Sequence, residues 1–141
     1  MKLTTTELNE KELKQLSGCR FLVGEFDNIL SFDIKKNRFF SVTDEYGGLC
    51  AIIRLTDNGD YIMADLGVAP NIYSKDHEKY IVRKFKEECV LHYPLKKIII
   101  QIKLPEERIL RFLEEEGFIR MKKYIRQTMT ENLEYIVLEY C

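Results

Sequence analysis

The chain has 141 residues, of which 45% are hydrophobic and 32% are charged, with 22 lysines and arginines against 23 aspartates and glutamates. A chain of this length fits one domain with a sizeable core, so we expect residues 1–141 to form a single domain. The nearly neutral charge gives no reason to expect binding to nucleic acid. No apolar run approaches the ~20 residues of a membrane span, and the N-terminus lacks the apolar middle of a secretory signal. The sequence therefore predicts a cytoplasmic protein without a membrane partner.

The cysteines are widely spaced along the chain. They are Cys19, Cys50, Cys89 and Cys141. They include no C-x-x-C pair, and His77 and His92 are the only histidines that could join them, so we expect no metal site. In a cytoplasmic protein such isolated cysteines are typical of small buried apolar residues.

Residues 1–38 give the weakest pattern. The stretch ELNEKELKQL at residues 7–16 predicts a helix, and residues 21–34 mix apolar and polar side chains. Ser17 and Gly18 separate the two stretches. We therefore expect a mainly helical N-terminal region.

Strands and turns then alternate. The predicted strands lie at residues 39–43, 49–55 and 61–68, with DEYGG at 44–48 as the first turn. Asn58-Gly59 predicts a tight second turn, because both residues tolerate the positive φ that hairpin turns need. Together these segments predict an antiparallel meander.

The hydrophobic period changes at Asp76. A long amphipathic helix is predicted from apolar residues at three- and four-residue spacing, namely Ile81, Val82, Phe85 and Cys89. Residues 97–102 are nearly continuously β-branched, which is typical of a strand covered on both faces. Strand, helix and strand in this order predict a right-handed parallel crossover.

The last part of the chain predicts a second helix and a pair of strands. Pro105 can begin the helix and Gly117 can end it. Its apolar stripe consists of Ile109, Leu110, Phe112 and Leu113. Strands are predicted at 118–125 and 133–140, and the second is apolar on both faces, so it could pair or pack across a homodimer. The expected fold class is therefore α+β with a mixed sheet.

Two local motifs accompany this order of elements. ADLGVAP at residues 64–70 ends the third strand of the meander, and RFLEEEGF at residues 111–118 leads from the second helix into the next strand. In order and motifs the chain resembles the GNAT superfamily of N-acyltransferases over residues 39–126. The resemblance implies a GNAT-like fold and transfer of an acetyl or other acyl group from acetyl-CoA to the amine of a small molecule or a protein.

The resemblance also implies where CoA would bind. In that family the fourth strand splays from its neighbour and pantetheine bonds its backbone, which here means Leu66, Gly67 and Val68. The pyrophosphate rests on a loop of pattern Gln/Arg-x-x-Gly-x-Gly/Ala, where free N–H groups at a helix N-terminus favour an anion. The corresponding residues are Tyr73, Ser74, Lys75, Asp76, His77 and Glu78, followed by Lys79.

The diagnostic positions of this loop depart from the family pattern. Tyr73 stands in place of Gln or Arg, and Asp76 and Glu78 stand in place of the small residues. A carboxylate ~5 Å from a phosphate charge costs roughly 3 kcal/mol at an effective dielectric of 20. Ser74 could instead cap the helix. Three nearby side chains could offset part of the repulsion: Lys75, His77 and Lys79.

The catalytic positions depart as well. Many family members protonate the leaving thiolate with a tyrosine four residues before the glycine of the Gly-Phe junction, and this position is Leu113 here. Glu106 replaces the asparagine that often lies seven residues earlier. Tyr124 or Tyr80 could serve as the acid if the fold brings its hydroxyl to the cleft. Asp65, inside the third meander strand, is the candidate base for an attacking ammonium.

These patterns leave several functions open. The first is an acyl-CoA-dependent N-acyltransferase that works mainly by positioning thioester and amine for direct attack. The second is a non-catalytic GNAT-like module that binds a ligand or a protein partner and has lost CoA binding, which Asp76, Glu78 and Leu113 favour. The third is an α+β interaction domain unrelated to that family.

Overall fold

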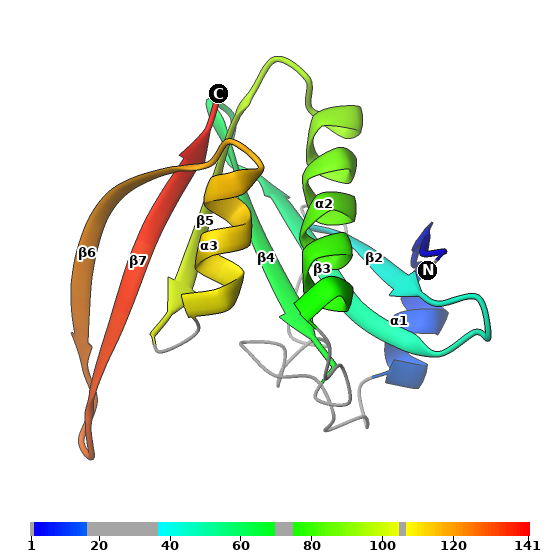
Figure 1. Ribbon diagram of the computed structural model, residues 1–141, viewed down its shortest axis with the longest axis horizontal. Coiled ribbons are helices and arrows are strands. Elements are labelled where there is room, and N and C mark those ends of the chain that lie inside the picture. The colour runs from blue at the N-terminus through cyan, green and yellow to red at the C-terminus, as the bar shows by residue number, and fades with distance from the viewer. Residues whose placement is uncertain (1, 17–36, 70–74, 105–106) are drawn as a thin grey trace.

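Seven strands and three helices make up the computed structural model, which describes residues 2–16, 37–69, 75–104 and 107–141 (Figure 1). In chain order they are β1 (Thr4–Glu7), α1 (Glu10–Leu16), β2 (Asn37–Thr43), β3 (Leu49–Asp57), β4 (Tyr61–Val68), α2 (Lys75–His92), β5 (Lys97–Lys103), α3 (Glu107–Glu115), β6 (Ile119–Gln127) and β7 (Asn132–Tyr140). The strands form one sheet in the order β1-β2-β3-β4-β5-β7-β6. Only β4 and β5 pair in parallel, so the sheet is mixed, as predicted.

The core lies between one face of this sheet and the helices α2 and α3, which lie side by side over it (Figure 1). Period-two alternation sends every second strand residue into this core. The strand residues that carry most of it are Phe40, Ile53, Leu55, Ile62, Ala64, Ile98, Ile100 and Leu138. The helices contribute Ile81, Val82, Phe85, Cys89, Ile109, Leu110 and Leu113. The apolar stripes predicted for both helices are therefore confirmed.

The N-terminal prediction was wrong in part, because residues 4–7 form a strand and the helix begins only at Glu10. Asn9 sets this boundary: its Oδ1 accepts the Glu12 N–H at 2.9 Å, while Glu12 Oε1 accepts the Asn9 N–H at 3.1 Å. Such a reciprocal capping box fixes the first helical turn. The preceding threonines pair with β2 instead. Residues 21–34 lie outside the part of the chain that the structure describes.

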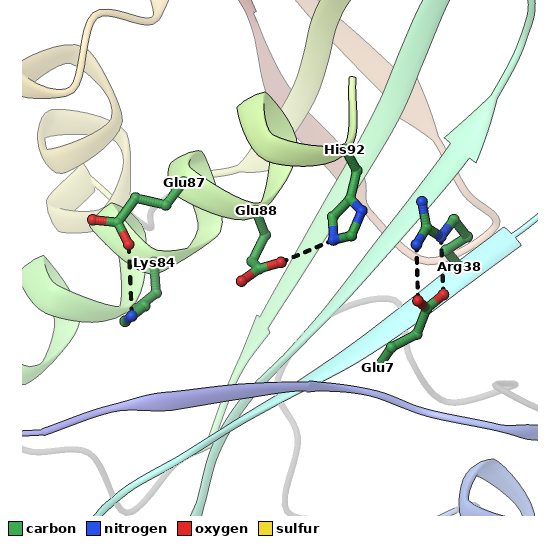
Figure 2. Close-up of polar contacts among 6 residues, drawn as sticks. All are labelled: Glu7, Arg38, Lys84, Glu87, Glu88 and His92. Atoms are coloured by element: carbon green, nitrogen blue, oxygen red, sulfur yellow. Dashed lines mark hydrogen bonds and ion pairs between the residues drawn. The ribbon is translucent and has the colours of Figure 1, made fainter. Parts of the chain in front are cut away.

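A two-bond ion pair holds β1 to β2. Arg38 donates to both carboxylate oxygens of Glu7 at 2.9 and 2.8 Å (Figure 2). The Arg38 hydrogen bond lowers the pKa of the Glu7 carboxyl below its ordinary value. His92 lies near this pair at the end of α2 and contacts Glu88, with 3.1 Å between Nε2 and Oε2 (Figure 2).

The meander follows the predicted turns with one difference. Asp44 Oδ1 accepts the N–H groups of Tyr46 and Gly48 in the first turn. In the second, Gly59 takes a φ of 90° and Asn58 does not have a positive φ, so one of the two expected positions is wrong. The Asn58 N–H bonds the Tyr61 carbonyl, so the two-residue turn consists of Gly59 and Asp60 and lies one residue later than predicted.

The C-terminal elements also follow the prediction closely. Gly117 ends α3 with a φ of 99°, a conformation that glycine adopts without steric cost. β7 lies between β5 and β6, and both of its edges are paired. Pairing of this strand across a dimer is therefore ruled out, since β6 forms the edge of the sheet, whereas packing of β7 across a homodimer stays a prediction. β5 is covered less completely than expected, because Ile99 and Gln101 stay partly exposed.

The cysteines divide into buried and exposed. Cys50 and Cys89 are buried, and burial raises the pKa of both thiols. Cys141 is exposed, so the expectation of burial is wrong there, and Cys19 lies outside the described ranges. None of the described helices is long and apolar enough to cross a membrane.

Candidate functional site

The centre of the sheet opens between its two parallel strands. The pairing of β4 with β5 ends with Ala64 opposite Ile100. β4 continues to Val68 paired with β3, and β5 continues to Lys103 paired with β7. The strands therefore separate, and in the described part of the chain residues 66–68 have no strand partner on the β5 side. Leu66, Gly67 and Val68, the predicted pantetheine contacts, lie in this splayed segment.

Asp65 lies where the strands begin to separate, on the sheet face opposite α2 and α3. Arg54 of β3 donates to its Oδ2 through Nε at 2.9 Å and Nη2 at 2.6 Å. The two side chains are only 10% and 19% exposed. A proton taken up by Asp65 would weaken this buried ion pair. The geometry therefore favours Asp65 as a fixed acceptor of hydrogen bonds over Asp65 as a base.

Tyr124 reaches the same place from β6. Its hydroxyl donates to Oε1 of Gln101, the first β5 residue after the last β4 pair. Its ring stacks on Tyr135, with centroids 5.1 Å apart and an interplanar angle of 12°. The Tyr124 hydroxyl thus lies beside the β5 residue at which the two strands separate, and its role as an alternative acid stays a prediction. Tyr80 does not lie there, because it is 40% exposed in a surface depression formed with Leu3 and other α2 residues.

The family position of the acid is structural in this chain. Leu113 is fully buried in the core between α3 and the sheet. No proton donor stands there, and the side chain instead fills the apolar stripe of its helix. Glu106 lies outside the residues that the structure describes.

The first turn of α2 carries the remaining predicted site residues. Tyr73 and Ser74 precede the described part of α2, and for Lys75 and Asp76 the structure gives the backbone only. The cap predicted at Ser74 therefore stays a prediction. Lys79 is exposed, and His77 is partly buried.

Glu78 is the residue whose placement was least expected. Its side chain is 8% exposed, and Oε1 lies 3.0 Å from Nη2 of Arg108 in the first turn of α3. Its Oε2 is enclosed, with no hydrogen-bond partner in the described structure. The carboxylate thus fills the position of a glycine or alanine in the family loop. Arg108 compensates the charge of the Glu78 carboxylate. The carboxylate therefore obstructs a phosphate mainly by its volume and because it needs Arg108 as its counter-charge.

This ion pair links the two helices that follow the separating strands. α2 follows β4 and α3 follows β5, so Glu78 and Arg108 join the first turns of the helices that follow the two separating strands. The backbone of residues 66–68 fits an extended amide-bearing arm. The α2 terminus does not fit a pyrophosphate, because a side chain stands where the phosphate would need a bare backbone.

Several of these residues were missed by sequence reasoning. No spacing motif marks Arg54, Gln101 or Arg108. They belong to the site only through their partners on other strands and helices. Alternation along β3 and β4 could have placed Arg54 opposite Asp65, given the register of the hairpin. In the described ranges no cluster of three or more His, Cys, Asp or Glu side chains could hold a metal ion.

Solved structures of N-acetyltransferases share this fold over almost their whole length. The spermidine/spermine N-acetyltransferase SpeG from Vibrio cholerae is similar with a TM-score of 0.75 and 14% identity, covering 98% of this chain and 91% of that chain. The ribosomal-protein-S18-alanine N-acetyltransferase from Escherichia coli gives 0.70 and 11%, covering 98% and 92%. No protein-family model and no curated protein matches the chain. The chain thus has the fold of the GNAT superfamily of N-acetyltransferases.

Proposed function

We propose that the chain is an N-acyltransferase that moves an acyl group from a thioester to the amine of a small molecule or a protein. The observation that carries the proposal is the separation of β4 and β5 after Ala64 and Ile100, beside Asp65, Gln101 and Tyr124. An extended thioester arm can bond the exposed strand backbone there. The names of the two similar enzymes give a polyamine and a protein alanine as substrates, which supports an amine acceptor.

In this proposal the protein acts mainly by positioning, which can supply much of the rate of a direct transfer. The bound thioester supplies the activated acyl carbonyl. Asp65, fixed by Arg54, accepts a hydrogen bond from the acceptor amine and orients it. As the N–C bond forms and the C–S bond breaks, Tyr124 delivers its hydroxyl proton, beside Gln101, to the leaving sulfur. The amine nitrogen loses a proton to water, and the tyrosinate regains one from water.

The Tyr124→Phe variant tests this assignment. We expect its kcat for thiol release, measured with acetyl thioester and a panel of amines that includes spermidine, to fall about 100-fold, since general acids contribute about that much or more. KM should not change, because the phenylalanine ring can still stack on Tyr135. Tyr46→Phe is the matched control, because Tyr46 is 89% exposed in the first meander turn. An unchanged kcat in Tyr124→Phe would exclude Tyr124 as the acid.

A second candidate function is a non-catalytic module that has lost CoA binding. Two observations favour it: the Glu78–Arg108 ion pair at the α2 terminus and the buried Leu113 at the family acid position. The amine panel separates the two functions. Thiol release above the uncatalysed rate with any amine supports the transferase, whereas none with any donor supports the module.

A further inference from the structure

Resting on the proposed transferase function, we propose that the acyl donor binds through its pantetheine arm alone, and that the nucleotide half of CoA adds no affinity. The donor class is then an acyl-pantetheine thioester, either free or carried on a protein through its phosphate. This departs from the family pattern, in which the pyrophosphate loop holds the nucleotide half.

The arm has a place to bind. Residues 66–68 of β4 and residues 101–103 of β5 continue as strands after the β4–β5 pairing ends, so their facing backbone groups are directed into the splay. Pantetheine contains two amides, and an extended amide chain can bond a strand edge as another strand does. This part of the site does not depend on the residues of the altered loop.

Among the described residues, the nucleotide diphosphate has no equivalent place. Glu78 occupies the position of the family's last small loop residue, and its Oε2 is enclosed by protein. A phosphate at this turn would compete with the Glu78 carboxylate for Arg108. To bind, it would have to take Arg108 away from Glu78.

Taking Arg108 away is strongly unfavourable. The Glu78 side chain is 8% exposed, and removing the cation would leave a buried carboxylate without its counter-charge. Arg108 is 48% exposed, but its charge is already used by this partner. The arginine is therefore not a free phosphate ligand.

The first experiment measures binding to the full chain by calorimetry, using CoA, pantetheine and adenosine 3′,5′-bisphosphate as probes. We expect Kd values for CoA and pantetheine that agree within about threefold, which is under 1 kcal/mol. Adenosine 3′,5′-bisphosphate, the nucleotide half, should not compete with either. CoA binding at least ~30-fold tighter than pantetheine would overturn the inference and leave the transferase proposal standing.

The Glu78→Gly variant tests whether Glu78 is the reason that the nucleotide half of CoA adds no affinity. Removing the carboxylate bares the backbone and frees Arg108, so CoA should bind about tenfold tighter while the Kd of pantetheine stays the same. Glu87→Gly is the matched control for the cost of glycine in the same helix, since Glu87 is exposed. No gain in CoA affinity in a folded Glu78→Gly protein would contradict the role assigned to Glu78.

Transfer assays with three donors separate the remaining outcomes. Acetyl-pantetheine and acetyl-CoA should give kcat/KM values within about threefold of each other, and a higher value for acetyl-pantetheine on a carrier protein would identify the carried form as the source. Preference for acetyl-CoA by ~30-fold would again overturn the inference alone. If neither pantetheine nor CoA binds and no donor is used, the inference and the proposed function both fail.

Discussion

Arg54 and Asp65 form the most enclosed charge pair of the candidate site, and their bonds tie β3 to β4 where β4 leaves β5. Buried ion pairs add little net stability, but the loss of one partner is costly because the other charge stays buried. The pair therefore fixes the position of the Asp65 carboxylate more than it stabilises the fold.

We expect Arg54→Met to lower the free energy of unfolding by about 3 kcal/mol, because Asp65 loses the cation that compensates its buried charge. The double variant Arg54→Met/Asp65→Leu should recover most of this loss, since both charges are then gone. Urea unfolding at pH 7 measures both. The control is Arg111→Met, at an exposed position of α3. Losses that simply add in the double variant would contradict a buried pair.

The residues of the site could be predicted from the sequence only where a local pattern marks them. Asp65 lies inside the strand predicted for it, and the helical period placed Leu113 in the core. The partners of Asp65 and Glu78 could not be predicted, because Arg54 and Arg108 approach only through the hairpin register and through the packing of α2 against α3.

At the scale of elements, the ends of helices and strands could be predicted where a turn or capping residue marks them in the sequence. β4 has the predicted bounds, because Gly59 marks the turn before it and a run of alternating residues follows. β1 could not be predicted, since it is only four residues long and its pairing with β2 is non-local. The helical pattern after Asn9 extended the predicted helix back to residue 7, over the end of this strand.

The pairing of β1 with β2 should depend on pH through Glu7. Its pKa is lowered from 4.5 by the Arg38 hydrogen bond, so the stability from this pair is present above pH 4.5 and is lost as the pH falls through the folded-state pKa. Comparing the unfolding free energies of the native chain and Glu7→Gln should give a constant difference of under ~1 kcal/mol from pH 7 to 5, because the pair is partly exposed. Below pH 4.5 the difference should shrink. A difference unchanged at pH 3 would show that the charge of Glu7 is not its cause.

At the scale of the whole molecule, Cys89 reports on global opening. It is fully buried against the sheet, and burial raises the pKa of its thiol, so the thiolate forms only when the core opens. Alkylation followed by peptide mass spectrometry should label Cys141 at once and Cys89 slowly. In Arg54→Met, with ~3 kcal/mol less stability, Cys89 labelling should be about 100-fold faster. Equal labelling rates of Cys89 in both proteins would mean that a local opening exposes it.

The early end of the β4–β5 pairing has a consequence for hydration. Backbone N–H and C=O groups that lose their strand partner must bond water or a ligand, because leaving them unpaired inside the sheet costs far more than the lost contact. Residues 66–68 of β4 therefore place polar backbone groups in contact with water in the middle of the sheet. Continuing the β4–β5 pairing over these residues would expel that water and stabilise the sheet. The proposed thioester arm would take the place of the same water.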